Sequence, residues 1–261
     1  MIVFQTIAVA FGMFSALPLP QPAWTPRNMR YALCAFPLVG LVCGLCWWGW
    51  TALAEFLAMP DLLRGAGLCL VPVLVTGGIH LDGYADTCDA LASCAPQKRK
   101  QEILADPHCG AFAVIRLCVY FVWMLALCTV VETGGNTPFC VGLAFVLERS
   151  LSGYAIVVFP LAKDSGLAHS FATAADRRRV KNILLLLICA SAGGMAALGD
   201  IGGKAMALAA LAALVWYWRV AKKQFGGVSG DLAGWFLQVA ELWQLTALVA
   251  VQLLLRALGT G

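Results

Sequence analysis

The sequence predicts an all-α protein, a polytopic helical bundle that is embedded in a membrane as one domain over residues 1–261. Hydrophobic residues make up 61% of the chain and charged residues only 12%, whereas about a quarter of the residues of soluble domains are charged. The mean hydropathy is +0.82. The apolar residues fall into long runs separated by short basic segments, which is the pattern of spanning helices and their loops.

The apolar runs predict about seven spanning helices and a short N-terminal helix. Residues 2–17 are barely long enough to cross about 30 Å of hydrocarbon. They lack the basic start and cleavage site of a signal peptide, so we expect a retained short helix. The expected spans are 31–59, a short run at 68–75 that continues into the glycines that follow it, 111–131, 138–160, 183–199, 205–218 and 232–257.

The distribution of Lys and Arg predicts how the chain is threaded through the membrane. Loops 18–30, 96–108, 161–182 and 219–229 are basic, whereas loops 59–66, 132–137 and 200–204 carry few such residues. Since basic loops remain in the cytoplasm, all four basic loops are expected on the cytoplasmic side. The net charge of +4 is modest and comes from these clusters, so we expect membrane lipid and no nucleic acid as a partner.

One stretch, 76–110, gathers acidic residues in this otherwise apolar chain. It holds Asp82, Asp86, Asp89, Glu102 and Asp106, five of the 14 acidic residues. If a helix begins near Asp82, the side chains of Asp82, Asp86 and Asp89 fall within roughly 60° of one another around its axis. The stretch therefore predicts a helix with three carboxylates on one face, at the cytoplasmic end of the bundle.

Carboxylates this close repel one another, so either some of them bind protons or a cation lies between them. Oxygen ligands of this kind suit Mg²⁺, which commonly binds one or two carboxylates together with substrate phosphates. A purely structural alternative is that acidic residues are favoured in the first turn of a helix. This alternative could account for Asp82 and Asp86, but not for Asp89, which lies beyond the first turn. We therefore predict a magnesium site on this face.

Other polar residues interrupt the apolar runs. Glu148 and Arg149 lie inside an expected span, where Arg149 could bind a phosphate or pair with a neighbour for structural reasons. A glycine-rich turn with Gly226 and Gly227 precedes Asp231 and the last expected helix. Its backbone N–H groups could hold an anion, and Asp231 could cap the helix or bind a cation.

The segments around the acidic face supply the remaining candidates. His80 could act as a base or donate to a phosphate, or simply bond the loop. Gly77 and Gly78 are candidate substrate-binding residues before the acidic helix. Lys98 and Arg99 could attract an anionic substrate, although basic residues beside a membrane more often set orientation. Carboxylates, an Arg and glycine turns together fit phosphoryl-group transfer, with one Asp accepting the proton of an attacking hydroxyl.

The motif Gly-Gly-Ile-His-Leu-Asp-Gly-Tyr-Ala-Asp-Thr-Cys-Asp-Ala at 77–90 resembles the signature of the cobalamin synthase family, the adenosylcobinamide-GDP ribazoletransferases. The resemblance extends along nearly the whole chain. It includes Arg99, 102–104, Asp106 and Gly110, and further matches at 17–20, 36–40, Arg149, 166–167, 226–227, 230–231 and 241–242.

The resemblance implies an enzyme of the bacterial inner membrane whose active site faces the cytoplasm. It would join adenosylcobinamide-GDP to α-ribazole or its 5′-phosphate, with Mg²⁺ as cofactor and release of GMP. It also leaves room for a homo-oligomer or an association with other cobalamin-assembly enzymes. Carried onto this chain, it makes metal or catalytic candidates of Asp82, Asp86, Asp89 and Asp106, and less directly of Arg149 and Asp231.

Two alternatives stay open from the sequence. The motif is loosely similar to that of CDP-alcohol phosphotransferases of lipid synthesis, but their Asp-Gly-x-x-Ala-Arg core is absent, since Asp86 and Thr87 occupy the Ala and Arg positions. A divalent-cation transporter would also carry acids within its helices, but it would need them at mid-bilayer, away from a basic surface segment.

Overall fold

The computed structural model describes residues 2–20 and 22–259, and in this part of the chain every regular element is a helix. Six described helices are long and apolar enough to span a membrane: α3 (Ala32–Phe56), α7 (Ala111–Val130), α8 (Thr137–Val158), α10 (Arg177–Leu198), α11 (Asp200–Val220), which runs on into the π-helical turn η1 (Ala221–Phe225), and α12 (Gly230–Ala257). The others are α1 (Ile2–Phe14), α2 (Pro26–Met29), α4 (Asp61–Thr76), α5 (Ile79–Ala92), α6 (Gln97–Ile103) and α9 (Leu167–Ala174). The predicted membrane-embedded helical bundle with a short first helix is confirmed.

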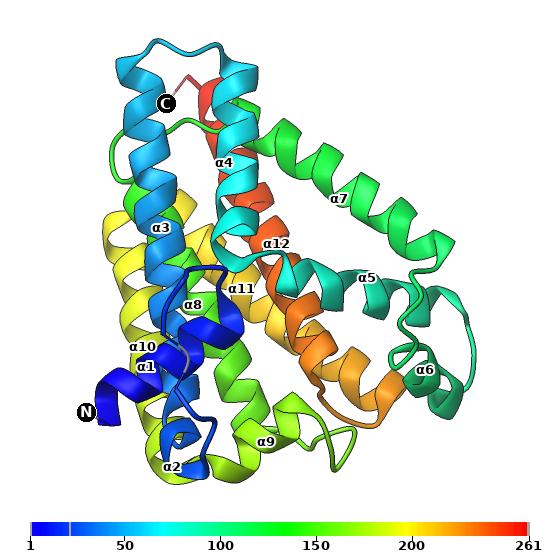
Figure 1. The fold of residues 1–261 in the computed structure, drawn as a ribbon. Coiled ribbons are helices and arrows are strands. Elements are labelled where there is room, and N and C mark those ends of the chain that lie inside the picture. The colour runs from blue at the N-terminus through cyan, green and yellow to red at the C-terminus, as the bar shows by residue number, and fades with distance from the viewer. Residues whose placement is uncertain (1, 21, 260–261) are drawn as a thin grey trace.

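The seventh expected crossing is a broken one. Helices α4 and α5 meet at 95°, and Figure 1 shows α5 running across the bundle instead of along it. Gly77 and Gly78 make the bend with φ values of +66° and +77°, in the left-handed region that side chains with a Cβ rarely adopt. The chain thus enters the bundle as α4 and turns sharply, so that the acidic helix lies across the neighbouring spans.

Helices α10 and α11 begin earlier than the apolar pattern predicted, at Arg177 and Asp200. The reason at α10 is a cap: the side chain of Asp176 accepts a hydrogen bond from the backbone N–H of Arg179 at 3.2 Å. This cap satisfies an N–H group that the first turn leaves without a helical partner. The basic residues expected in the preceding loop therefore lie in the first turn of α10.

Small residues let α3 and α8 pack backbone against backbone. A Cβ at Gly40 would lie 2.3 Å from the carbonyl oxygen of Phe145, and one at Gly44 would lie 2.6 Å from Cα of Gly142. Close approach at small residues is a common way for membrane helices to associate, because van der Waals packing replaces the hydrophobic effect between them. This contact makes α8 the buried centre of the bundle.

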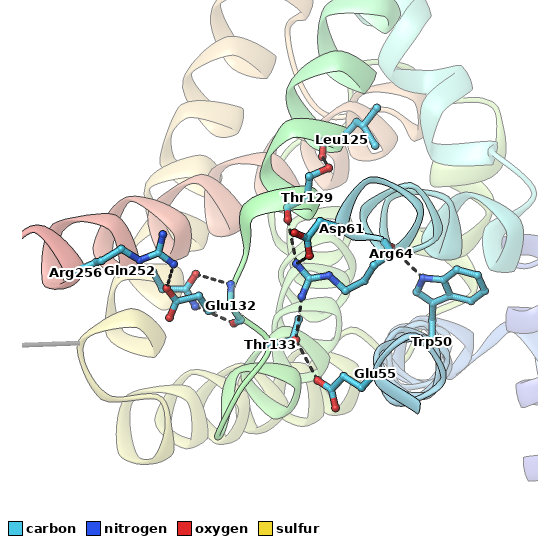
Figure 2. A network of polar contacts seen from close by, with 10 residues as sticks. All are labelled: Trp50, Glu55, Asp61, Arg64, Leu125, Thr129, Glu132, Thr133, Gln252 and Arg256. Carbon is cyan, nitrogen blue, oxygen red and sulfur yellow. Dashed lines mark hydrogen bonds and ion pairs between the residues drawn. The ribbon is translucent and has the colours of Figure 1, made fainter. Parts of the chain in front are cut away.

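A polar network fastens the helix ends at one end of the bundle (Figure 2). The guanidinium of Arg64 on α4 donates to the carbonyl of Thr129 on α7 at 3.0 Å and to the hydroxyl of Thr133 at 3.4 Å. Arg256 on α12 forms an ion pair with Glu132, in the segment that follows α7. The network therefore ties α4, α7 and α12 together at this end.

The basic segments gather at the other end. Figure 1 places α2, α6, α9 and the turn from α11 to α12 at its lower end, and the α3–α4 turn and the C-terminal end of α12 at its upper end. These lower segments contain the four basic loops of the sequence. The arrangement fits the alternation of basic and non-basic loops on which the predicted threading rests.

Candidate active site

Helix α5 carries the three carboxylates as one stripe. Its buried side chains include His80, Tyr84 and Cys88, whereas Asp82 is exposed and Asp86 and Asp89 are half-buried. The prediction that one helix holds all three carboxylates on one side is confirmed. The stripe therefore remains accessible while the opposite face of α5 packs into the bundle.

A close helix crossing adds a fourth carboxylate to the stripe. A Cβ at Gly83 of α5 would lie 2.6 Å from the carbonyl oxygen of Asp231, and one at Gly234 of α12 would lie 3.0 Å from that of His80. Ser229 caps α12 by accepting the N–H of Leu232 at 3.3 Å, so Asp231 falls in the first turn of the helix. Small residues at the crossing thus bring Asp231 beside α5.

The carboxylates of Asp82, Asp86, Asp89 and Asp231 lie close enough to repel one another, and none of them forms an ion pair with a described residue. Asp86 lies within electrostatic range of the other three. All seven ion pairs among the described residues involve other acids. The cation that acts on Asp231 is Lys163, and its Nζ already donates to the carbonyl of Gln101 at 3.2 Å. The negative charge of the stripe is therefore largely uncompensated, which is a setting that favours a bound cation.

The donor set fits magnesium in a particular way. In the described residues, no three His, Cys, Asp or Glu side chains converge closely enough to hold a metal ion by themselves. Mg²⁺ usually takes only one or two carboxylates and completes its octahedron with water and substrate phosphates. The stripe fits an ion that is held in part by the protein and in part by a phosphorylated substrate.

Asp89 has a second neighbour that explains its position. A Cβ at Gly110 would lie 2.2 Å from both carboxylate oxygens of Asp89, and Gly110 is the residue that precedes the first turn of α7. The N-terminus of a helix carries partial positive charge and free N–H groups, so it stabilises a nearby carboxylate. Gly110 leaves room for this contact between α5 and α7.

Asp106 lies outside helix α5, in the segment between α6 and α7. Its carboxylate accepts the backbone N–H of His108 at 3.0 Å and contacts the Nδ1 of the same residue at 2.7 Å. The hydrogen bond from that backbone N–H lowers the pKa of Asp106 below its ordinary value. The residue is exposed in the segment between α6 and α7, and the acids that act on Asp86 do not include it. A metal-binding role for Asp106 stays a prediction.

The glycines predicted to bind substrate have structural roles. Gly77 and Gly78 form the bend between α4 and α5, and Gly226 ends η1 with φ +83°. A Cβ at Gly227 would lie 2.5 Å from the backbone of Leu161. The turn at 226–229 is thereby held against the segment that follows α8, as two backbone hydrogen bonds of 2.9 Å between residues 160–162 and 228 also show. Substrate contact at these glycines remains a prediction.

Helix α6 presents Lys98 and Arg99 to solvent. The guanidinium of Arg99 pairs with Glu102 at 2.9 Å, while Lys98 has no ion pair among the described residues. The buried member of the basic run is Lys100, which donates to the side chain of Gln224 at 2.6 Å and so docks α6 on η1. The two predicted substrate-binding residues therefore line the outer side of α6, away from the direct contacts of the stripe.

Arg149 lies in the interior of the bundle instead of at the stripe. Only 1% of its surface is exposed, and its guanidinium donates to Glu148 and to the carbonyl of Phe145. Gln244 of α12 donates to the other oxygen of Glu148 at 3.2 Å, and Tyr120 donates to Glu241 at 3.2 Å. These contacts match the structural alternative for Arg149, and Glu241, only 7% exposed, lies in the interior as well.

A cavity of about 230 Å³ lies next to the stripe, and Asp82, Asp231 and His80 line it. His80 is only 5% exposed, and its Nε2 has no hydrogen-bond partner among the described residues. Much of the remaining wall is apolar, with Phe14 from α1 and Phe171 from α9. No pattern in the sequence indicated these two walls, because both belong to segments far from the acidic stretch in the chain.

Comparison with known proteins identifies close relatives. The sequence model of the family described as cobalamin-5-phosphate synthase matches residues 6–249. A relative from Lachnoclostridium phytofermentans, named adenosylcobinamide-GDP ribazoletransferase, is 38% identical over 95% of this chain and 94% of its own length. Relatives with the same name from Pseudomonas entomophila and Clostridium botulinum strain Alaska E43 are 33% and 30% identical, and each alignment covers 92% of this chain and at least 94% of the relative. No solved structure matches the chain.

These matches confirm the resemblance that the motif at 77–90 suggested. They cover nearly the whole length of the relatives, so the likeness is not confined to the acidic helix. They favour this family over the CDP-alcohol phosphotransferases and over a cation transporter.

Proposed function

Because the chain belongs to the cobalamin-5-phosphate synthase family and is a membrane-embedded transferase of cobalamin biosynthesis, we propose that it joins adenosylcobinamide-GDP to α-ribazole or to α-ribazole 5′-phosphate and releases GMP. The main support for the proposal is the group of four carboxylates beside the crossing of α5 and α12, whose negative charge is largely uncompensated. A diphosphate substrate brings negative charge of its own, so this group requires a bridging cation to accept it.

Each candidate residue has a separate role in this proposal. One or two of the carboxylates of Asp82, Asp86, Asp89 and Asp231 would bind Mg²⁺. The bound ion would neutralise the phosphate charge that builds up as the bond to GMP breaks. Arg149 is left out of this set because its guanidinium is already bonded to Glu148 and Phe145. Lys98 and Arg99 serve at most to attract the anionic substrate toward the site.

The transfer step balances as follows. A ribose hydroxyl of α-ribazole attacks the phosphorus that is bonded to the cobinamide side chain. The bond between that phosphorus and the oxygen that bridges to the second phosphate breaks, and GMP leaves with the bridging oxygen and its electron pair. A carboxylate of the stripe accepts the proton of the attacking hydroxyl, for which Asp82 and Asp231 are the nearest to the cavity. His80 is a second candidate for this proton.

We also propose that the protein resides in the bacterial inner membrane and that its stripe opens to the cytoplasm. The support is the gathering of the basic segments at one end of the bundle, since such segments remain on the cytoplasmic side. Both nucleotide and Mg²⁺ are available on that side.

The test of the function is the release of GMP by the purified full-length protein in lipid nanodiscs. Adenosylcobinamide-GDP, α-ribazole 5′-phosphate and Mg²⁺ are supplied together, and each is omitted in turn. We expect GMP and a cobalamin product only in the complete mixture, and loss of both after chelation of the metal. GMP release that continues without any ribazole acceptor would contradict transfer, and release that survives chelation would contradict the metal requirement.

A further inference from the structure

The cavity beside the stripe has walls suited to a flat aromatic group. The ring of Phe14 lies 4.2 Å from that of Phe36 and 5.6 Å from that of Phe171, and the ring of Phe36 lies 5.7 Å from that of His80, measured between centroids. Aromatic side chains bind a planar ring by offset stacking and edge contacts. Four rings from α1, α3, α5 and α9 therefore line one apolar site.

The size of the cavity limits what it can hold. Its volume is about 230 Å³, and pockets for drug-sized ligands measure roughly 300–1,000 Å³. A bicyclic base fits a volume at the low end of this scale, whereas a corrin ring does not. The cavity also reaches Asp82 and Asp231, so a base bound within it would hold an attached sugar close to the carboxylates.

His80 offers one buried polar contact in this apolar wall. Its Nε2 is buried and has no partner in the described part of the chain, whereas buried polar atoms in native proteins are nearly always hydrogen-bonded. His80 lines the cavity, so a ligand with one acceptor on its ring would take a hydrogen bond from the imidazole. Guanine carries several donors and acceptors, and most of them would stay unpaired against phenyl rings at a substantial cost.

We propose that this cavity binds the benzimidazole of the ribazole substrate. The ring nitrogen that carries the ribose has no free lone pair, so the other ring nitrogen is the acceptor of the base, and the imidazole N–H of His80, a residue that lines the cavity, donates to it. The ribose then extends toward Asp82 and Asp231. This assignment rests on the proposed function, and it makes His80 a specificity-determining residue instead of the base.

The first experiment measures binding of α-ribazole alone to the full-length protein in nanodiscs by calorimetry. Ala168 on α9 lines the cavity, while Ala172, one helical turn further along α9, lines a separate hollow of about 440 Å³. We expect Ala168→Phe to fill the cavity and weaken binding of α-ribazole at least tenfold. The matched variant Ala172→Phe should bind it as the unmodified protein does.

The second experiment replaces one ligand atom and does not depend on a variant that folds. The α-riboside of 5,6-dimethylindole has a C–H group in place of the unsubstituted ring nitrogen of α-ribazole. Loss of the hydrogen bond leaves the imidazole N–H of His80 without a partner in the ligand, so the unmodified protein should bind this analogue roughly tenfold more weakly than α-ribazole. His80→Phe should bind the two ligands equally.

The outcomes separate this proposal from the transfer reaction. Equal binding of the two ribosides by the unmodified protein, or normal α-ribazole binding by a folded Ala168→Phe, would overturn the cavity assignment even if GMP is released. If binding follows the predictions but no GMP forms, the assignment stands and the transfer proposal fails. When transfer does occur, Ala168→Phe should raise KM for α-ribazole and leave KM for adenosylcobinamide-GDP unchanged.

Discussion

Asp86 is the central carboxylate of the stripe, because the charges of Asp82, Asp89 and Asp231 all influence it electrostatically. The spacing of the three α5 carboxylates could be read from the sequence, since a helical period places them on one face. The position of Asp231 relative to them could not, because it depends on the glycines that let α5 and α12 cross closely. The residues of the site were thus predictable where they share a helix, and less so where two helices meet.

The variant Asp86→Asn tests this residue directly. Removal of its charge should lower the rate of GMP release by about 10²-fold or more, because the variant lacks a metal-binding or proton-accepting oxygen. Thermal stability should not fall, since the substitution relieves repulsion between like charges. Asp61→Asn removes a surface acid at the far end of the bundle and should keep full activity. Full activity of Asp86→Asn would remove this carboxylate from the mechanism.

For the buried pair of Glu148 and Arg149 we predict a role in stability and not in catalysis. Arg149→Met leaves the carboxylate of Glu148 in the interior without its cation, which should lower the free energy of unfolding by about 3–5 kcal/mol. Adding Glu148→Gln to the same chain should restore most of this loss, because the uncompensated charge is gone. Chemical unfolding in detergent measures both effects. A stable Arg149→Met with a raised KM for adenosylcobinamide-GDP would instead assign Arg149 to the phosphates.

At the scale of elements, the apolar runs predicted the spanning helices well, because lipid requires long helices whatever their partners are. The bend between α4 and α5 was not predicted. A pair of adjacent glycines is compatible with a straight helix, a kink or a turn, and only their packing against the neighbouring elements fixes φ. The bend is nevertheless what turns the acidic helix across the bundle.

The crossing of α5 over α12 depends on Gly83. Gly83→Ala places a Cβ 2.6 Å from the carbonyl oxygen of Asp231, so the helices must separate, at a cost of about 1–3 kcal/mol. We expect a lower melting temperature and a clear loss of GMP release, since Asp231 moves away from Asp86. Gly49→Ala is the matched control on α3, because no atom lies within 4 Å of its added Cβ. An equal response of the two variants would show that close packing at Gly83 does not hold the site together.

At the scale of the whole molecule, α1 and α9 close the site from opposite parts of the chain. Phe14 and Phe171 line the same cavity, although more than half of the chain separates them in sequence. Such contacts leave no local pattern, so the acidic stretch could be found from the sequence alone while the cavity beside it could not.

The orientation of the bundle can be tested with thiol chemistry. Cys94 and Cys109 are exposed and lie in the basic segment between α5 and α7. A charged maleimide that does not cross membranes should label them in inverted membrane vesicles and not in intact spheroplasts. Gly134→Cys, in the segment between α7 and α8, should show the opposite pattern, and Cys94→Ser with Cys109→Ser provides the background. Labelling of Cys94 and Cys109 from outside the cell would place the stripe on the wrong side for its substrate.

The most direct measurement of the central claim is the phosphorus hyperfine coupling of bound Mn²⁺, a paramagnetic substitute for Mg²⁺, in the complex of the full-length protein with adenosylcobinamide-GDP. A cation that links the carboxylates of α5 to the diphosphate should give ³¹P coupling in the unmodified protein and lose it in Asp86→Asn. A bound Mn²⁺ without ³¹P coupling, or the same coupling in both proteins, would contradict the claim that the acidic stripe binds the substrate through a metal ion.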